Sequence, residues 1–256
     1  MRPCYKPRHG DREPSRRRFE PEDSIEPSPI ALLSFADNAQ PITIALVIAF
    51  LVISLGIHEA AHGWTALQCG DTTARDLGRI TLNPFAHIDL FMTIILPIVC
   101  ILSPGQFLFG GAKPVPVNFH ALRRPYRDMA LVALAGPASN VVLAALAFAV
   151  QRLLVVKLGI WEPNTIGDTV LDWTISVNLL LAAFNLLPIP PLDGSRVMTF
   201  LLPTGLREAY QRLEAFGLLL VVVCVFLVPP VQELMWESID LLRRFVEYTV
   251  TLGGLW

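Results

Sequence analysis

Charged side chains are scarce in this sequence. Of its 256 residues only 16% are charged and 53% are hydrophobic, and the mean hydropathy is +0.52. Soluble domains carry about 25% charged residues. The composition therefore disfavours a single soluble core and predicts several membrane-spanning segments. The net charge of −2 leaves no basic surface that would indicate nucleic-acid binding.

The sequence also shows no CxxC pair and no internal repeat, and its first residues do not predict a signal peptide. The cysteines are Cys4, Cys69, Cys100 and Cys224. They form no CxxC pair, so we expect free thiols rather than a disulfide or a sulfur–metal site. Met1–Ser28 contains no apolar h-region, so no signal peptide is expected. Transporters often consist of paired repeats, and the lack of a repeat weighs against that class.

The composition divides the chain into three parts. Residues 1–40 are rich in proline, arginine and glutamate and predict a disordered tail and linker. Residues 41–203 contain most of the long apolar segments and predict a membrane-embedded core. Residues 204–256 predict a further membrane helix followed by an amphipathic helix, because charges accompany the apolar spacing in 231–252.

The apolar segments predict an α-helical polytopic membrane protein with about five to six membrane segments. The segments are Pro41–Leu67, Ile88–Leu102, Asp128–Leu154, Thr169–Leu187 and Leu213–Val228, with 231–252 as an amphipathic stretch on the interface or on the bundle. The glycines and prolines of "GGAKPVPVN", residues 110–118, interrupt any helix. We therefore expect an extended stretch there that re-enters the membrane as a loop or lies at its surface.

His58, Glu59 and His62 form an HExxH motif late in the first apolar segment. Positions i and i+4 share one helix face. Two imidazoles at this spacing can hold one zinc ion, and the adjacent glutamate can act as a general base. The alternative is a pair of hydrogen-bonded core histidines. Ionisable residues inside a membrane segment are functional by default, which favours the metal site.

A zinc site needs a third protein ligand, and the sequence offers two candidates. His87 lies in the loop "NPFAHID", where a local hydrogen bond is the more common role. Asp193 lies in "FNLLPIPPLDGSR", where three prolines end the preceding helix. Taken alone, Asp193 fits a helix N-cap equally well. Because HExxH lacks a third ligand, we expect Asp193 to supply it.

Together, HExxH and the later NxxPxPxLDG resemble the site-2 protease family (peptidase M50), zinc metalloproteases that cut within the membrane. "GGAKPVPVN" and "LVALAGPASN" (Leu131–Asn140) also resemble segments of its compact members. The resemblance covers roughly Pro41–Pro203, and neither a PDZ nor a CBS insertion is visible.

The resemblance implies an intramembrane zinc metalloprotease with one Zn²⁺ per chain. It makes His58, His62 and Asp193 the zinc ligands and Glu59 the general base. Asn185 matches the asparagine that helps to hold the substrate or the oxyanion. The implied partners are transmembrane protein substrates and the lipid bilayer, with no nucleic acid. The oligomeric state stays open. A catalytically inactive zinc-binding scaffold and a transporter are the alternatives.

Shared zinc ligands constrain the topology. The first and fourth segments should run in the same direction, and Asp128–Leu154 in the opposite one. The loops on one side then contain Arg75, Arg79, Arg123, Arg124, Arg127, Arg196, Arg207 and Arg212, whereas the opposite loop, Gly159–Asp168, contains no arginine. The positive-inside rule predicts a multi-pass protein of the cell membrane whose active site lies nearer the cytoplasmic face.

Two further features have alternative roles. Asn140 and Asn178 lie inside apolar segments, where hydrogen bonding between helices is expected and substrate contact is the alternative. The Gly110–Asn118 segment could pair with an unwound substrate by β-augmentation, or plug the bundle as a packing loop.

Overall fold

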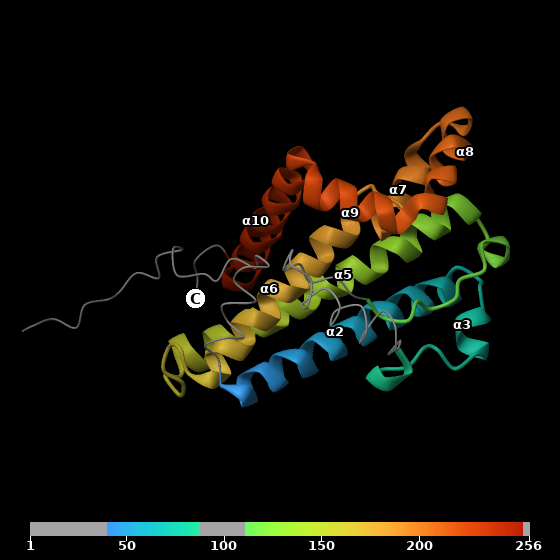
Figure 1. Cartoon of the computed structure of the whole chain (residues 1–256). Helices are drawn as coiled ribbons and strands as arrows, with labels where there is room; N and C mark the ends of the chain where they lie inside the picture. Colours follow the sequence, from blue (N-terminus) through green and yellow to red (C-terminus); the bar gives the residue numbers. More distant parts are fainter. Residues whose placement is uncertain (1–39, 88–110, 253–256) are drawn as a thin grey trace, which may run out of the picture.

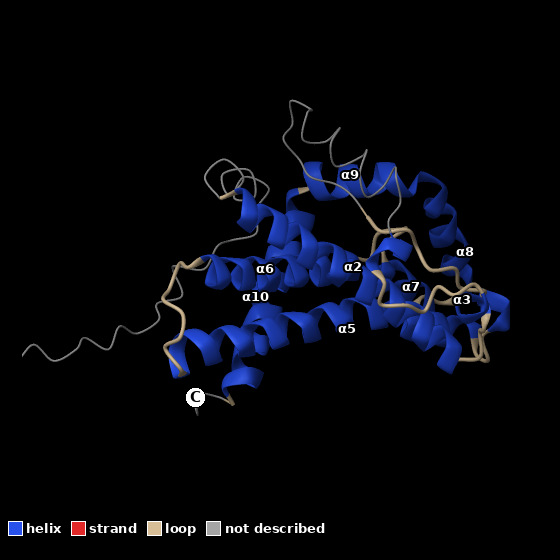
Figure 2. Ribbon diagram, turned by 90° about the horizontal axis from the view of Figure 1, so that it is seen from below, coloured by secondary structure: helices blue, strands red, loops and turns tan. Residues whose placement is uncertain are grey.

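Three long helices form the centre of the structure, a computed structural model that describes residues 40–87 and 111–252. They are α2 (Pro41–Gln68), α5 (Pro125–Gln151) and α6 (Ile166–Leu186). Helix α5 packs against both of the others, and the three lie side by side (Figure 1). Every regular element in the described residues is helical (Figure 2).

The ends of these helices follow from the local sequence. Pro41 occupies the first turn of α2, where its missing N–H costs nothing. Gly70 follows the helix with φ +109°, a conformation that favours glycine. The Thr165 side chain accepts a hydrogen bond from the Asp168 N–H and so caps the start of α6. The predicted apolar segments in these three regions are confirmed as helices.

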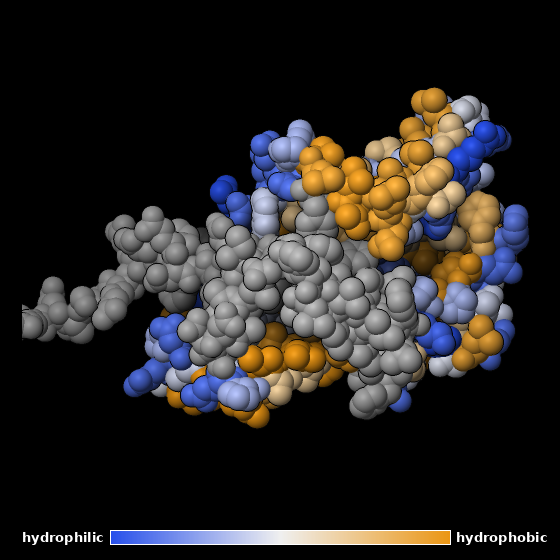
Figure 3. Space-filling model, viewed as in Figure 1, coloured by the Kyte–Doolittle hydropathy of each residue, from blue (hydrophilic) through white to orange (hydrophobic). Residues whose placement is uncertain are grey.

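The three helices are long and apolar enough to cross a membrane. They comprise 28, 33 and 21 residues when the π-type turns Arg152–Lys157 (η5) are counted with α5. The bent pair Thr204–Val225 and Pro229–Thr251 would be a fourth span. Hydrophobic surface covers the visible part of α2 and much of α9 (Gly217–Leu227) (Figure 3). The predicted segment Ile88–Leu102 lies outside the described residues.

Interhelical contacts give the helix directions. His58 of α2 contacts Asn140 of α5. His62, one turn further along α2, contacts Val132, which comes earlier in α5. The two helices therefore run in opposite directions, as the shared-ligand argument requires. The Arg123 N–H donates to the Cys69 carbonyl oxygen (3.1 Å), so the chain between α2 and α5 starts and finishes at the same end of the bundle.

Helix α6 runs in the same direction as α2. The Asn178 side-chain amide donates to the Ser54 hydroxyl (3.0 Å), and the loop after α6 brings Asp193 to His58 and His62, further along α2. The expected interhelical hydrogen bond of Asn178 is thus confirmed.

The remaining helices pack on this core and on one another. They are α7 (Asp193–Leu201), α8 (Thr204–Arg212), η6 (Leu213–Phe216), α9 and α10 (Pro229–Thr251), with the short α3 (Thr73–Asp76), η2 (Pro84–His87) and η4 (Phe119–Ala121) between α2 and α5. Helix α10 buries Met235, Ile239 and Val246 and packs on α5 and α6. The Arg243 guanidinium donates to the Ser176 hydroxyl (3.1 Å). The charged C-terminal stretch therefore lies on the bundle.

Gly194 allows α7 to begin directly against the end of α6. A Cβ atom there would overlap the Leu186 carbonyl oxygen and lie 2.5 Å from that of Leu187.

Gly194→Ala should therefore lower the free energy of unfolding by about 1–3 kcal/mol or more, measured by thermal unfolding of the purified chain in detergent. The control is Gly205→Ala in α8, where a Cβ meets nothing within 4 Å and should be neutral or stabilising. Equal melting temperatures for the two variants would contradict this.

Candidate active site

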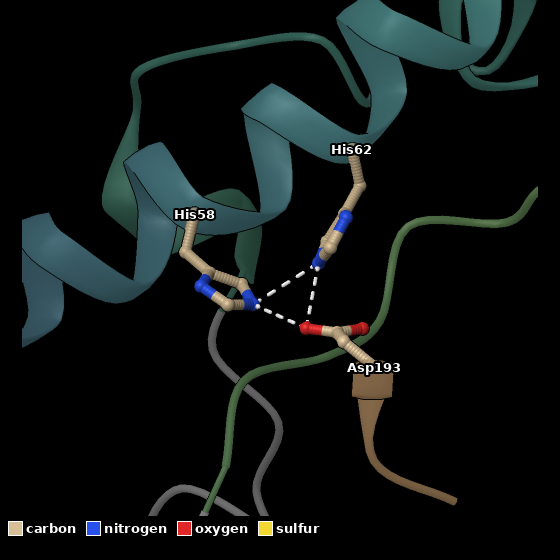
Figure 4. A group of neighbouring side chains, drawn as sticks. All are labelled: His58, His62 and Asp193. Atoms are coloured by element: carbon tan, nitrogen blue, oxygen red, sulfur yellow. Dashed lines mark hydrogen bonds and ion pairs between the residues drawn. The ribbon is translucent and has the colours of Figure 1, made fainter. Parts of the chain in front are cut away.

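Three side chains from distant parts of the sequence converge inside the bundle. His58 and His62 extend from α2, and Asp193 extends from the start of α7 (Figure 4). The two imidazole Nε2 atoms are 3.0 Å apart. Asp193 Oδ2 lies 3.3 Å from His58 Nε2 and 3.4 Å from His62 Nε2. Among the described residues, these three form a group able to hold a metal ion.

The hydrogen bonds around the group show that it fits a cation. His62 Nδ1 donates to the Val132 carbonyl oxygen (2.7 Å), and His58 Nδ1 faces Asn140 Oδ1 (3.2 Å). His62 Nδ1 therefore carries the ring hydrogen, as does His58 Nδ1 with the Asn140 oxygen toward it, and both Nε2 atoms then present lone pairs. Asp193 Oδ2 is buried and has no hydrogen-bond donor in the described part of the chain. Buried lone pairs facing one another are unfavourable without a cation. Two nitrogens and one carboxylate oxygen are ligands typical of zinc.

Asp193 must be ionised to serve as a metal ligand. Its loop is fixed by the prolines that end α6 and by the Tyr210 hydroxyl, which donates to the Pro188 carbonyl oxygen (2.8 Å). In the sequence, the proline-rich loop before Asp193 is the feature that identified this residue as a candidate third ligand.

Glu59 points toward the segment Gly111–Asn118, which forms neither helix nor strand. Its Oε2 atom accepts a hydrogen bond from the Val115 backbone N–H (2.8 Å). The neighbouring Pro114 and Pro116 have no N–H to donate, so Val115 supplies the donor at this point of the segment. The carboxylate of the predicted general base is therefore held by the segment that the sequence predicted to be extended.

Other contacts fasten the same segment to the end of α2 and its loop. Asp71 is fully buried, and its carboxylate accepts the Asn118 N–H (2.6 Å). Burial raises the pKa of Asp71, but hydrogen bonds from Thr73 and Asn118 hold it below its usual value. The Lys113 N–H donates to the His87 carbonyl oxygen (2.8 Å). The His87 ring contacts the Thr81 carbonyl oxygen (3.0 Å), so His87 bonds locally and lies outside the metal-ligand group.

Asn185 lies near the end of α6, half-buried. Its side-chain amide donates to the Leu181 carbonyl oxygen in its own helix (2.9 Å). No described contact joins this amide to the three ligand side chains. Its role toward the substrate or oxyanion stays a prediction.

Helix α5 contributes residues that the sequence reasoning did not assign to the site. Val132, Gly136 and Asn140 follow one another at four-residue spacing and share one face. A Cβ atom on Gly136 would lie 2.5 Å from His62 Cε1 and 2.6 Å from His58 Cε1. Gly136 therefore makes the room in which both imidazoles lie. Asn140 makes the interhelical contact expected of it, and its partner is His58.

The fold and the site together define a class of protein. A histidine pair and a carboxylate that fit zinc, with a glutamate beside them, lie between apolar helices able to span a membrane. This is the arrangement of a membrane metalloprotease.

Comparison with known proteins identifies the particular family. The model of Peptidase family M50 matches residues 46–163 and 163–228. A Bacillus subtilis protein, "Putative zinc metalloprotease YwhC", is 37% identical over 196 residues, 74% of this chain and 84% of the relative. "Putative zinc metalloprotease Rip2" of Mycolicibacterium smegmatis is 29% identical over 252 residues, 90% of this chain and 93% of the relative. No solved structure matches the chain significantly. The chain belongs to peptidase family M50, the site-2 protease family, and is a membrane metalloprotease.

The close approach at Gly136 can be tested through metal content. In Gly136→Ala the added methyl group would displace both imidazoles, so the purified chain should lose most of its zinc, measured by inductively coupled plasma mass spectrometry. Gly111→Ala, where a Cβ meets nothing within 4 Å, should keep wild-type zinc. Full zinc in Gly136→Ala would show that the imidazoles do not depend on this contact.

Proposed function

We propose that this chain is an intramembrane zinc endopeptidase of the site-2 type, which hydrolyses peptide bonds within transmembrane segments of other proteins in regulated intramembrane proteolysis. The observation that carries the proposal is the convergence of His58, His62 and Asp193 between candidate spanning helices. A peptide bond that reaches these side chains must enter the helical bundle, which favours a substrate already in the membrane.

Each predicted site residue has a part in the proposed reaction. His58, His62 and Asp193 would hold one zinc ion, which supplies Lewis acidity toward water and the scissile carbonyl group. Glu59 takes a proton from the attacking water and returns it to the leaving amine nitrogen. Asn185 donates a hydrogen bond to the substrate carbonyl oxygen as negative charge develops on it, and one such donor is typically worth about 3 kcal/mol.

The substrate must be unwound before it is cut. A helix in lipid has all its peptide groups hydrogen-bonded internally, so the enzyme has to offer replacement partners. We propose that Gly111–Asn118 does this by pairing with the unwound segment. The segment forms neither helix nor strand and contacts Glu59 through Val115, so a chain bound along it would lie beside the proposed base.

We further propose a multi-pass arrangement in the cell membrane with the active site nearer the cytoplasmic face. Residues 41–203 would form the protease core, 204–256 the C-terminal helices, and 1–40 a tail. A re-entrant loop that includes Ile88–Leu102 would bring the total to five to six membrane segments. The hydrogen bond between the Arg123 and Cys69 backbones supports such a loop, because it joins the two ends of the segment that connects α2 to α5.

Removal of the base tests the reaction. Glu59→Gln keeps the three ligands and should bind zinc, but it should slow cleavage by about 10²- to 10⁴-fold because proton transfer is lost. Quantitative membrane proteomics of cells that carry the variant should then show single-span proteins or membrane stubs accumulating. Glu162→Gln, the same charge change in the opposite loop, serves as the control. If zinc is bound but no protein accumulates under several growth and stress conditions, the inactive zinc-binding scaffold is the better account.

Labelling of single cysteines tests the topology. In a variant with its native cysteines replaced by serine, Glu162→Cys should react with a membrane-impermeant maleimide on intact cells. Arg124→Cys should react only after permeabilisation, because the positive-inside rule places its loop in the cytoplasm. Labelling of both positions from one side would rule out the proposed arrangement.

A further inference from the structure

Helix α5 contacts the side of each imidazole that faces away from the site. His62 Nδ1 donates to the Val132 carbonyl oxygen, and His58 Nδ1 faces the side-chain oxygen of Asn140. Helix α2 presents the two histidines four residues apart. Antiparallel α5 offers its partners from Val132 and Asn140, with Gly136 midway between them. Residues on one face of α5 therefore contact both rings.

We propose that Asn140 is a positioning residue for the metal site: its side-chain oxygen fixes the ring orientation and tautomer of His58. The inference rests on the zinc site proposed above. With the oxygen toward the ring, the hydrogen lies on His58 Nδ1, and Nε2 keeps its lone pair. The opposite orientation of the amide would present N–H groups to Nδ1. The ring hydrogen would then lie on Nε2 and point at His62 and Asp193, where it would block a cation.

The surroundings of Asn140 support this role. The residue is fully buried, with 0% of its surface exposed, and its Nδ2 atom has no hydrogen-bond partner in the described part of the chain. An unbonded buried amide is costly. An apolar residue at position 140 would avoid this cost. The presence of asparagine there is therefore explained by the contact of its side-chain oxygen with His58.

Asn178 provides a comparison within the same protein. It is also buried, at 1% exposed, and its amide also reaches α2, where it donates to the Ser54 hydroxyl one turn before His58. Both asparagines therefore join a neighbouring helix to α2, but only Asn140 contacts a proposed zinc ligand. Substitutions of the two residues therefore distinguish an effect of helix packing from an effect of ligand positioning.

Zinc affinity of the purified full chain in detergent tests the proposal, measured by competition with a chromogenic chelator. Asn140→Ala should bind zinc about 10- to 100-fold more weakly, the usual cost of losing an outer partner of a metal-ligating histidine. Asn140→Asp keeps an acceptor in place and should retain wild-type affinity or exceed it. Asn178→Ala should bind zinc as the wild type does. Cobalt-substituted chains should show altered visible absorption bands in Asn140→Ala alone.

Unchanged affinity in Asn140→Ala would overturn the proposal. So would an equal loss in Asn178→Ala, because the effect would then come from helix packing. If Asn140→Ala is not recovered folded, Asn140→Asp decides, and weaker zinc binding there would count against the inference. A wild type that binds no zinc would overturn the proposed function as well, whereas uniformly tight binding in every variant would overturn this inference alone.

Discussion

Three buried electron-pair donors that face one another are the constraint on which the rest of this structure depends. His58 Nε2, His62 Nε2 and Asp193 Oδ2 lie within 3.0 to 3.4 Å of each other, an arrangement that a cation makes favourable. To assemble it, two helices must run in parallel, so that a loop after one reaches the middle of the other. The helix between them must run the opposite way. The direction of each central helix is therefore tied to the chemistry of the site.

Close backbone approaches allow this convergence. Gly136 leaves room on α5 for both imidazoles, and Gly194 lets α7 begin against the last turn of α6. At each position a single methyl group would collide with the neighbouring element. A separate segment, Gly111–Asn118, holds Glu59 through the Val115 backbone N–H. The metal-binding side chains are thus supported by α5 and the proposed base by a separate segment, so that the two groups can be perturbed independently.

Much of this was predictable from the sequence, because the signals were local. The HExxH spacing placed two histidines on one face, the three prolines located the loop of Asp193, and apolar runs located the central helices. The remaining features depend on the register between helices, which no single segment encodes. The contacts of Val132 with His62 and of Val115 with Glu59 use backbone atoms, and these carry no signature of side-chain type. Asn140 was expected to join two helices, but its partner became apparent only from the antiparallel alignment of α2 and α5.

Metal analysis with X-ray absorption spectroscopy of the purified chain tests the central claim most directly. We expect one zinc ion per chain, bound by two imidazole nitrogens at about 2.0–2.1 Å and carboxylate or water oxygen at about 2.0–2.2 Å. In Asp193→Ala the carboxylate oxygen should be lost from this shell, with weaker retention of the metal. A chain that binds no zinc, or a zinc ion whose shell is identical in the wild type and in Asp193→Ala, would contradict the account.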